Sequence, residues 1–125
     1  MIGVPYVAEI TATTGRRAVS LGGVTMANRR LALRWLRWQA LRLANGSGAP
    51  EPPPTGARDV QPITFRGPAA PNGLRAWAED PDQQDQAIGL LESGCPDLLT
   101  VFDPAAGLLV TLAGWPLRSA RAVGD

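Results

Sequence analysis

The segment from Thr25 to Asn45 contains neither proline nor glycine, although the chain of 125 residues has 14 glycines and 12 prolines. Because proline and glycine end or weaken helices, this segment can hold a long uninterrupted helix. Thr25 is an acceptable N-cap, and Asn45-Gly46 is typical of a helix C-terminus. We therefore predict one long helix over residues 25–45.

The apolar side chains of this predicted helix cover well over half of its circumference, which is more than one sheet needs to cover a helix. At 100° per residue they form two stripes. The first stripe is Leu31, Trp35 and Trp38, and the second is Ala32, Leu36, Ala40 and Leu43. The remaining arc is occupied by Arg30, Arg34 and Arg37. Either the helix is deeply buried in its own domain, or one stripe contacts a partner. We favour the partner, which makes Trp35, Trp38 and Leu36 candidate contact residues.

The N-terminal residues have the pattern of a β-hairpin. Residues 6–12 alternate in side-chain type and are rich in β-branched residues, which is typical of a strand. Residues 14–16 can turn the chain, residues 17–21 can return as a second strand, and Gly22-Gly23 ends it. Residues 46–59 contain three consecutive prolines, which favour an extended polyproline conformation and predict a linker or loop.

The second half of the chain reads as a β-α-β pattern. Asp82 is the expected N-cap of a helix that ends at Ser93-Gly94, and Asp85 places negative charge at its N-terminus. The other expected elements are a short strand at 63–65, a turn at 71–73, a strand or helical turn at 74–78, a hairpin of strands 98–102 and 108–112, and a tail or edge strand at 117–123. The fold class is therefore α+β: a small mixed or antiparallel sheet packed by two helices, with an extended Pro-rich loop. Residues 1–125 form one domain, divided into 1–45, 46–59 and 60–125.

Charge is distributed unevenly although the net charge is only +1. Residues 1–45 carry seven arginines and one acid, a net charge of +6, whereas residues 46–125 carry five arginines and ten acids, a net charge of −5. A basic and an acidic face suit contact between copies, with Arg30, Arg34 and Arg37 facing carboxylates such as Asp82 and Asp85. The alternative is a solvated surface whose two halves pair within the fold.

The side-chain inventory argues against catalysis. The sequence has no histidine, which removes the commonest general base and metal ligand, and no lysine for a Schiff base. Cys95 is a lone cysteine without a base to activate it, so we expect no enzyme, no cofactor and no metal. The acidic residues 79–85 lack the spacing of a calcium loop, and helix capping explains them more simply. Nucleic acid is not the expected partner, because the chain is not basic overall and has no groove-reading motif.

The segment "ARDVQPITFRG", the helix ending "AIGLLESG" and "DLLTVFDPAAGLLVTLAGW" resemble the layout of tail protein U of contractile-tailed phages. The matching positions are Ile63, Thr64, Gly67, the helix 83–94, and the strands 98–102 and 107–110, which cover about half of the chain. The long Trp-rich helix and the "PEPPPTG" segment depart from that layout. The resemblance implies a structural protein of the phage tail, such as a terminator, a tube-end adaptor or a baseplate component, without catalysis.

We therefore expect a virion component that assembles into ring-like oligomers in the host cytoplasm, with other copies and neighbouring tail proteins as partners. The alternative is a small cytosolic adaptor that binds protein or nucleic acid. The sequence predicts neither a membrane span nor a secretory leader, because no run of eighteen apolar residues and no charged-then-apolar start is present.

Overall fold

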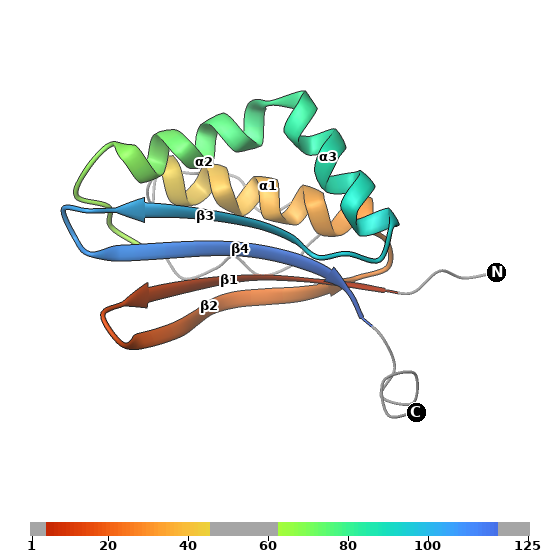
Figure 1. Ribbon diagram of the computed structural model, residues 1–125, viewed down its shortest axis with the longest axis horizontal. Coiled ribbons are helices and arrows are strands. Elements are labelled where there is room, and N and C mark those ends of the chain that lie inside the picture. Colours follow the sequence, from red (N-terminus) through yellow and green to blue (C-terminus); the bar gives the residue numbers. More distant parts are fainter. Residues whose placement is uncertain (1–4, 46–62, 118–125) are drawn as a thin grey trace.

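A computed structural model describes residues 5–45 and 63–117. Within these residues, two β-hairpins flank three helices along the chain (Figure 1). The elements are β1 (Tyr6–Thr14), β2 (Arg17–Met26), α1 (Arg29–Asn45), α2 (Ala69–Glu79), α3 (Pro81–Glu92), β3 (Asp97–Asp103) and β4 (Leu108–Pro116). The predicted α+β class is confirmed, with three helices in place of two. The Pro-rich segment 46–59 and the tail beyond Leu117 lie outside the described residues.

The four strands form one antiparallel sheet in the order β2-β1-β4-β3. Each hairpin contributes an outer and an inner strand, and the two inner strands pair from Tyr6 opposite Pro116 to Thr14 opposite Leu108. Both predicted hairpin turns are present, and each has a glycine in the left-handed region: Gly15 at φ 57° and Gly107 at φ 63°. Glycine adopts this conformation without the steric cost that other residues carry.

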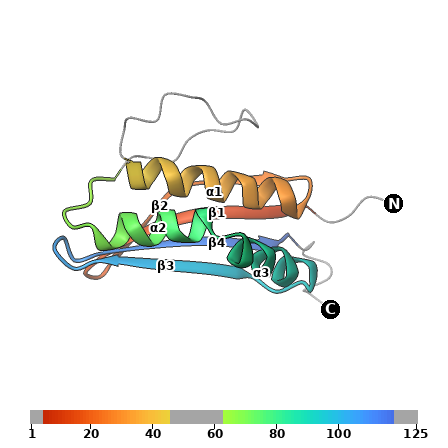
Figure 2. The ribbon, with the colours of Figure 1, turned by 90° about the horizontal axis from the view of Figure 1, so that it is seen from above.

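The three helices lie together on one face of the sheet (Figure 2). Helix α1 lies mainly over β1, and α2 lies beside α1 and over β3. Alternate strand residues point into the layer between sheet and helices, where they form the core with the buried residues of α1, α2 and α3. Those of the two inner strands include Tyr6, Ala8, Ile10, Leu108, Val110 and Leu112.

Helix α1 ends at Asn45 as predicted, but it begins at Arg29 rather than at Thr25. Gly22-Gly23 does not end the second strand as predicted: β2 continues through these glycines to Met26. Thr25 therefore pairs with Val7 in the sheet and is not a helix cap. Asn28 takes the capping role, because its Oδ1 accepts a hydrogen bond of 3.0 Å from the backbone N–H of Leu31. Because Thr25 is paired in the sheet, the helix begins only after the asparagine three residues later, which was not predicted as its cap.

The region before α3 differs most from its prediction. Residues 63–65 are not a strand, and the Pro71-Asn72-Gly73 segment, predicted as a turn, lies inside helix α2. Proline is tolerated in the first helical turn, where its missing N–H has no intrahelical acceptor. A Cβ at Gly73 would lie 3.1 Å from a methyl carbon of Val101, so the glycine allows α2 to approach β3 closely.

The N-cap of helix α3 lies two residues earlier in the chain than predicted. Its N-cap is Asp80, whose Oδ1 accepts a 2.9 Å hydrogen bond from the backbone N–H of Asp82. Pro81 then occupies the first helical position, where its fixed φ suits the helix. Asp82 is therefore a residue of the first turn and not the cap.

Asp97, the first residue of β3, provides a test of stability against pH. Burial raises the pKa of its carboxyl above the usual 3.8, because desolvation disfavours the charged form. The folded state thus holds the proton more tightly than the unfolded state, and folding loses stability as pH rises from 3.8 through the raised pKa. We expect Asp97→Asn to raise the melting temperature at pH 7 but not at pH 3, measured by thermal denaturation against the parent protein. An equal difference at both pH values would contradict this assignment.

Candidate interaction surfaces

Two of the predicted contact residues on α1 belong to the protein's own core. Trp35 and Leu36 are each 1% exposed, so they offer no surface to a partner. The reason is that α1 packs against the sheet on one side and against α2 and α3 on another. This packing buries the whole stripe of Ala32, Leu36, Ala40 and Leu43, and it buries Trp35 of the other stripe. The sequence left open whether this helix is buried in its own domain or contacts a partner. For Trp35 and Leu36, burial in the protein's own domain is correct. Trp38 is partly exposed.

The predicted arginines gather at one place, along a shallow pocket between α1 and α3. The pocket has a volume of about 240 Å³ and is lined by Arg30, Arg34 and Arg37 with Leu33, Gln84 and Ile88. The three arginines are exposed, at positions i, i+4 and i+7 of one helix face. The α3 residues Gln84 and Ile88 were not predicted, because the sequence does not reveal which helix face lies beside α1.

Two polar side chains of this pocket are anchored by backbone carbonyls of α2. Arg37 donates a hydrogen bond from Nε to the carbonyl oxygen of Ala78. Gln84 donates from Nε2 to the carbonyl oxygen of Trp77 over 2.8 Å. Because a carbonyl can only accept, the amide nitrogen of Gln84 must face Trp77, and Oε1 is left as a buried acceptor without a partner among the described residues.

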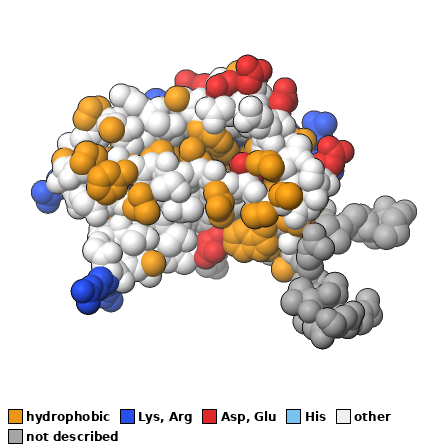
Figure 3. Space-filling view, viewed as in Figure 1, with side chains coloured by type: hydrophobic (Ala, Val, Ile, Leu, Met, Phe, Trp, Pro, Cys, Tyr) orange, Lys and Arg blue, Asp and Glu red, His pale blue; other side chains and the backbone are white. Residues whose placement is uncertain are grey.

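The predicted acidic residues Asp82 and Asp85 are exposed on the first turns of α3. Acidic side chains gather over this part of the molecule (Figure 3). The two charged halves of the chain also meet within the fold, since Arg29 on α1 and Glu92 on α3 form an ion pair of 3.5 Å. The alternative of pairing within the fold therefore holds for this one pair. Among the described residues, Arg30 and Arg34 form no ion pair.

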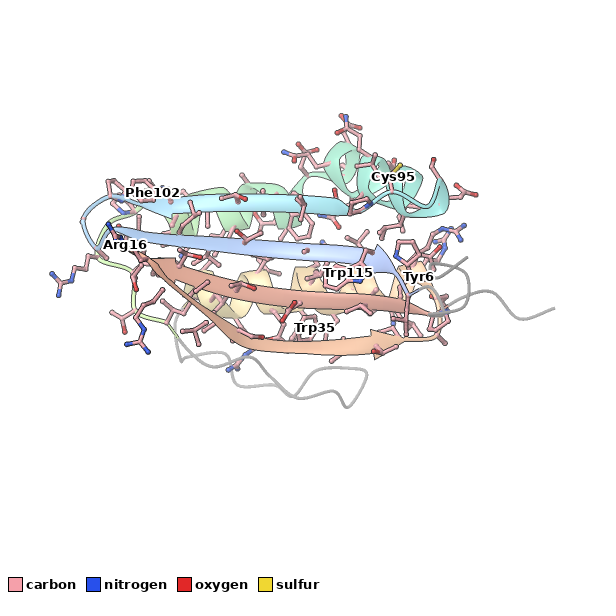
Figure 4. The ribbon with its side chains drawn as sticks, turned by 60° about the horizontal axis from the view of Figure 1, so that its bottom comes forward. Tyr6, Arg16, Trp35, Cys95, Phe102 and Trp115 are labelled. Carbon is pink, nitrogen blue, oxygen red and sulfur yellow. The ribbon has the colours of Figure 1, made fainter. Side chains whose placement is uncertain are left out.

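The second surface is the face of the sheet that the helices do not cover. Figure 4 looks onto this face, with the helices behind the sheet, Phe102 on β3 and Trp115 on β4. Leu98 is 63% exposed and Phe102 is 51% exposed, the two highest values among the large apolar side chains of the described residues. By alternation and register, the side chains on this open sheet face are those of Val7, Glu9, Thr11, Thr13, Ala18, Ser20, Thr25, Leu98, Thr100, Phe102, Leu109, Thr111, Ala113 and Trp115.

The open sheet face is almost free of charge. Glu9 is its one charged side chain among the described strands, and it accepts a 2.9 Å hydrogen bond from the hydroxyl of Ser20. The face was not identified from the sequence. Strands β3 and β4 are apolar at successive positions, which is typical of strands buried on both sides, and nothing in that pattern says that one side lacks a cover.

The described residues contain no group of three or more potential metal ligands of the His, Cys, Asp and Glu types. Cys95 is exposed and forms no disulfide. No helix in the described part of the chain combines the length and apolar character that a membrane crossing requires.

Comparisons of this chain with models of known protein families, with curated proteins and with solved structures found no match.

Proposed function

We propose that this protein is a structural subunit of a bacteriophage tail, and that a neighbouring subunit covers its open sheet face. The observation that supports this proposal is the exposure of Leu98 and Phe102 beside the partly exposed Trp115 on an almost uncharged sheet. Burial of one such side chain stabilises a contact by about 1.5–3 kcal/mol. An assembly in which each copy buries this face is therefore more stable than separate copies, in which these apolar side chains remain exposed to water.

The size of the face suits a protein partner. Nine-residue strands are about 30 Å long, and four strands spaced by about 4.8 Å span roughly 15 Å between the outer axes. The large apolar side chains of this face, Leu98, Phe102, Leu109 and Trp115, lie on the neighbouring strands β3 and β4, and an exposed apolar patch of several hundred Å² is typical of protein–protein contact sites. The position in the virion, as a terminator, tube-end adaptor or baseplate component in a ring-like oligomer, rests on the resemblance of the segment from Arg58 onward to tail protein U.

The alternative is a small cytosolic adaptor that binds protein or nucleic acid. Nucleic acid does not suit the open sheet face, because a phosphate backbone is bound mainly by arginine and lysine and this face has neither. The adaptor would use the arginines of α1 instead. Salt-dependent binding of DNA by the purified protein would favour it over the tail subunit.

The test is a pair of substitutions on the open sheet face. We expect Leu98→Lys with Phe102→Lys to convert oligomers into monomers in sedimentation velocity, without loss of the folded circular dichroism spectrum. Lysine is common on edge strands such as β3, so the monomer should still fold. Leu90→Lys is the matched control, because Leu90 is 43% exposed on α3 and lies away from the sheet.

The parent protein should form rings or short tubes under the electron microscope. A parent that stays monomeric at every concentration, or oligomers that survive the double substitution, would contradict the proposed role of the open sheet face.

A further inference from the structure

The open sheet face consists of two halves that differ in the size of their side chains. Strands β3 and β4 carry its large apolar side chains: Leu98, Phe102, Leu109 and Trp115. Figure 4 shows Phe102 and Trp115 on this part of the sheet, which we name the bulky half. Strands β1 and β2 carry mostly alanine, serine, threonine and glycine on this face, with Val7 and Glu9 as the larger side chains, and we name this part the small half.

The small half is hollowed beside Gly23, which pairs with Glu9 in the register. With their neighbours these two residues line a depression of about 310 Å³: Val7, Ala8, Glu9, Gly23, Val24 and Thr25. A Cβ at Gly23 would lie 2.9 Å from the carbonyl oxygen of Ala8, so a larger residue cannot stand here unless the backbone shifts. The hollow therefore results from the fold itself, because the close approach of β2 to β1 requires glycine at this position.

The register arranges the two halves in rows that cross the sheet from β2 to β3. Two of these rows are Gly23, Glu9, Ala113, Leu98 and Ala18, Thr13, Leu109, Phe102. In each row a large apolar side chain lies on the outer strand β3, and a residue with a small side chain or none lies on the outer strand β2. A copy turned over about a two-fold axis along the strands reverses each row. Its Leu98 then faces Gly23 of the first copy, and its Phe102 faces Ala18.

We propose that two copies of the protein pack their open sheet faces together about a two-fold axis that runs along the strands, so that the bulky half of each copy covers the small half of the other. Such a contact is isologous, since the same surface serves both partners. The helices do not obstruct it, because all three lie on the other face of the sheet (Figure 2). This inference rests on the proposed function and names the subunit that covers the face. The contact closes at two copies, so a ring would be built from such dimers through other surfaces.

The area of the face makes the fit between the two halves decisive. With the width of the outer strands included, the face measures about 30 Å by roughly 20 Å, so two copies bury on the order of 1,000 Å². This area is near the lower limit for a specific contact between proteins, so the contact depends on close packing of its side chains. A second copy brings large side chains to the positions where the first copy has Gly23 and Ala18, whereas a flat partner would leave the hollow unfilled.

Glu9 distinguishes a second copy from a different partner. The two-fold axis passes between the inner strands β1 and β4, so the two Glu9 side chains of a dimer lie close to each other. Like charges across a contact weaken it. We expect Glu9→Gln to strengthen self-association about threefold or more, while glutamine keeps an acceptor oxygen for the Ser20 hydroxyl. A partner with a cation over Glu9 would give the opposite sign, so weaker association of this variant would overturn the two-fold contact.

The main experiment exchanges the large and the small residue of one row. Ala18 and Phe102 lie on the two outer strands, about 14 Å apart within one chain, so they cannot touch each other there. In sedimentation equilibrium we expect Ala18→Phe, which crowds two phenylalanines, and Phe102→Ala, which leaves a gap, each to weaken association about tenfold or more. The double variant again places phenylalanine opposite alanine. We expect its dissociation constant to lie within about threefold of the parent's, because the two changes compensate across the contact.

The matched control is Val19→Phe. Val19 is 50% exposed and follows Ala18 on β2, but it pairs with Ala12 and so lies on the helix side of the sheet. We expect this variant to associate like the parent. A control that weakens association as much as Ala18→Phe would overturn the two-fold contact.

The outcomes separate this contact from the proposed function. If Leu98→Lys with Phe102→Lys abolishes association but the effects of Ala18→Phe and Phe102→Ala simply add, the open sheet face still binds a neighbour and the two-fold contact is overturned. If the oligomers survive the lysine pair, both proposals fail. Recovery of association in the double variant supports the two-fold contact, since the two residues meet only between copies.

Discussion

Leu36→Asp is expected to unfold the protein. Leu36 is 1% exposed at the centre of the face that α1 turns toward the sheet. One of its methyl carbons lies 3.3 Å from where a Cβ at Gly114 on β4 would stand, so α1 packs closely on β4 at this residue. An unpaired carboxylate buried there costs several kcal/mol, whereas a domain of this size is stable by about 5–15 kcal/mol. Urea denaturation monitored by circular dichroism measures the loss.

Two further substitutions on α1 show whether the effect comes from burial. Leu36→Ala leaves a cavity without adding charge and should cost about 2–5 kcal/mol. Arg34→Asp puts the same carboxylate on the exposed side of the same helix and should change stability by less than about 1 kcal/mol. A folded Leu36→Asp protein with the parent's denaturation midpoint would show that Leu36 is not buried.

The sequence could not decide what covers α1, although it located that helix and its arginines. The wide apolar arc of α1 fits either a partner or a second helix of the same chain. The second helix, α2, was missed because Pro71, Asn72 and Gly73 are the residues of a turn in most local contexts. Their helical conformation depends on packing against β3, which is a long-range contact. Only a strand or a helical turn was expected at 74–78, where the full helix α2 stands. The prediction that Trp35 and Leu36 contact a partner is wrong, because both are buried in the protein's own core.

Sequence patterns were sufficient to predict those features that depend only on residues close together in the chain. Both hairpin turns and the end of α1 follow from glycine and asparagine at positions where the chain must reverse or stop. The two candidate surfaces could not be predicted in this way, because each is formed by segments that are far apart in the sequence. The row of arginines on α1 follows from a helical wheel, but the unpaired Gln84 Oε1 and the open sheet face follow only from the way α3 and the four strands are placed.

The structural role of Asp103 also depends on a segment that is distant in the sequence. It was predicted only as part of the turn between two strands, yet it is fully buried at the end of β3. Its Oδ2 accepts a hydrogen bond of 2.7 Å from the backbone N–H of Arg66, in the segment that leads into α2. A Cβ at Gly67 would lie 3.3 Å from Oδ1, so the glycine lets the backbone approach the carboxylate.

We expect Asp103→Ala to destabilise the protein by about 2–3 kcal/mol, because a hydrogen bond to a charged group is lost and the Arg66 N–H keeps no acceptor. Asp103→Asn preserves an acceptor oxygen of nearly the same shape and should lose less. Amide hydrogen exchange distinguishes this contact from a general loss of stability, since the Arg66 amide should exchange faster in the alanine variant under conditions where the core amides of β1 and β4 keep their protection. Asp85→Ala, at an exposed position, is the control and should leave the Arg66 amide unchanged. Equal exchange of that amide in the alanine and asparagine variants would mean that the side chain of residue 103 does not hold the segment before α2.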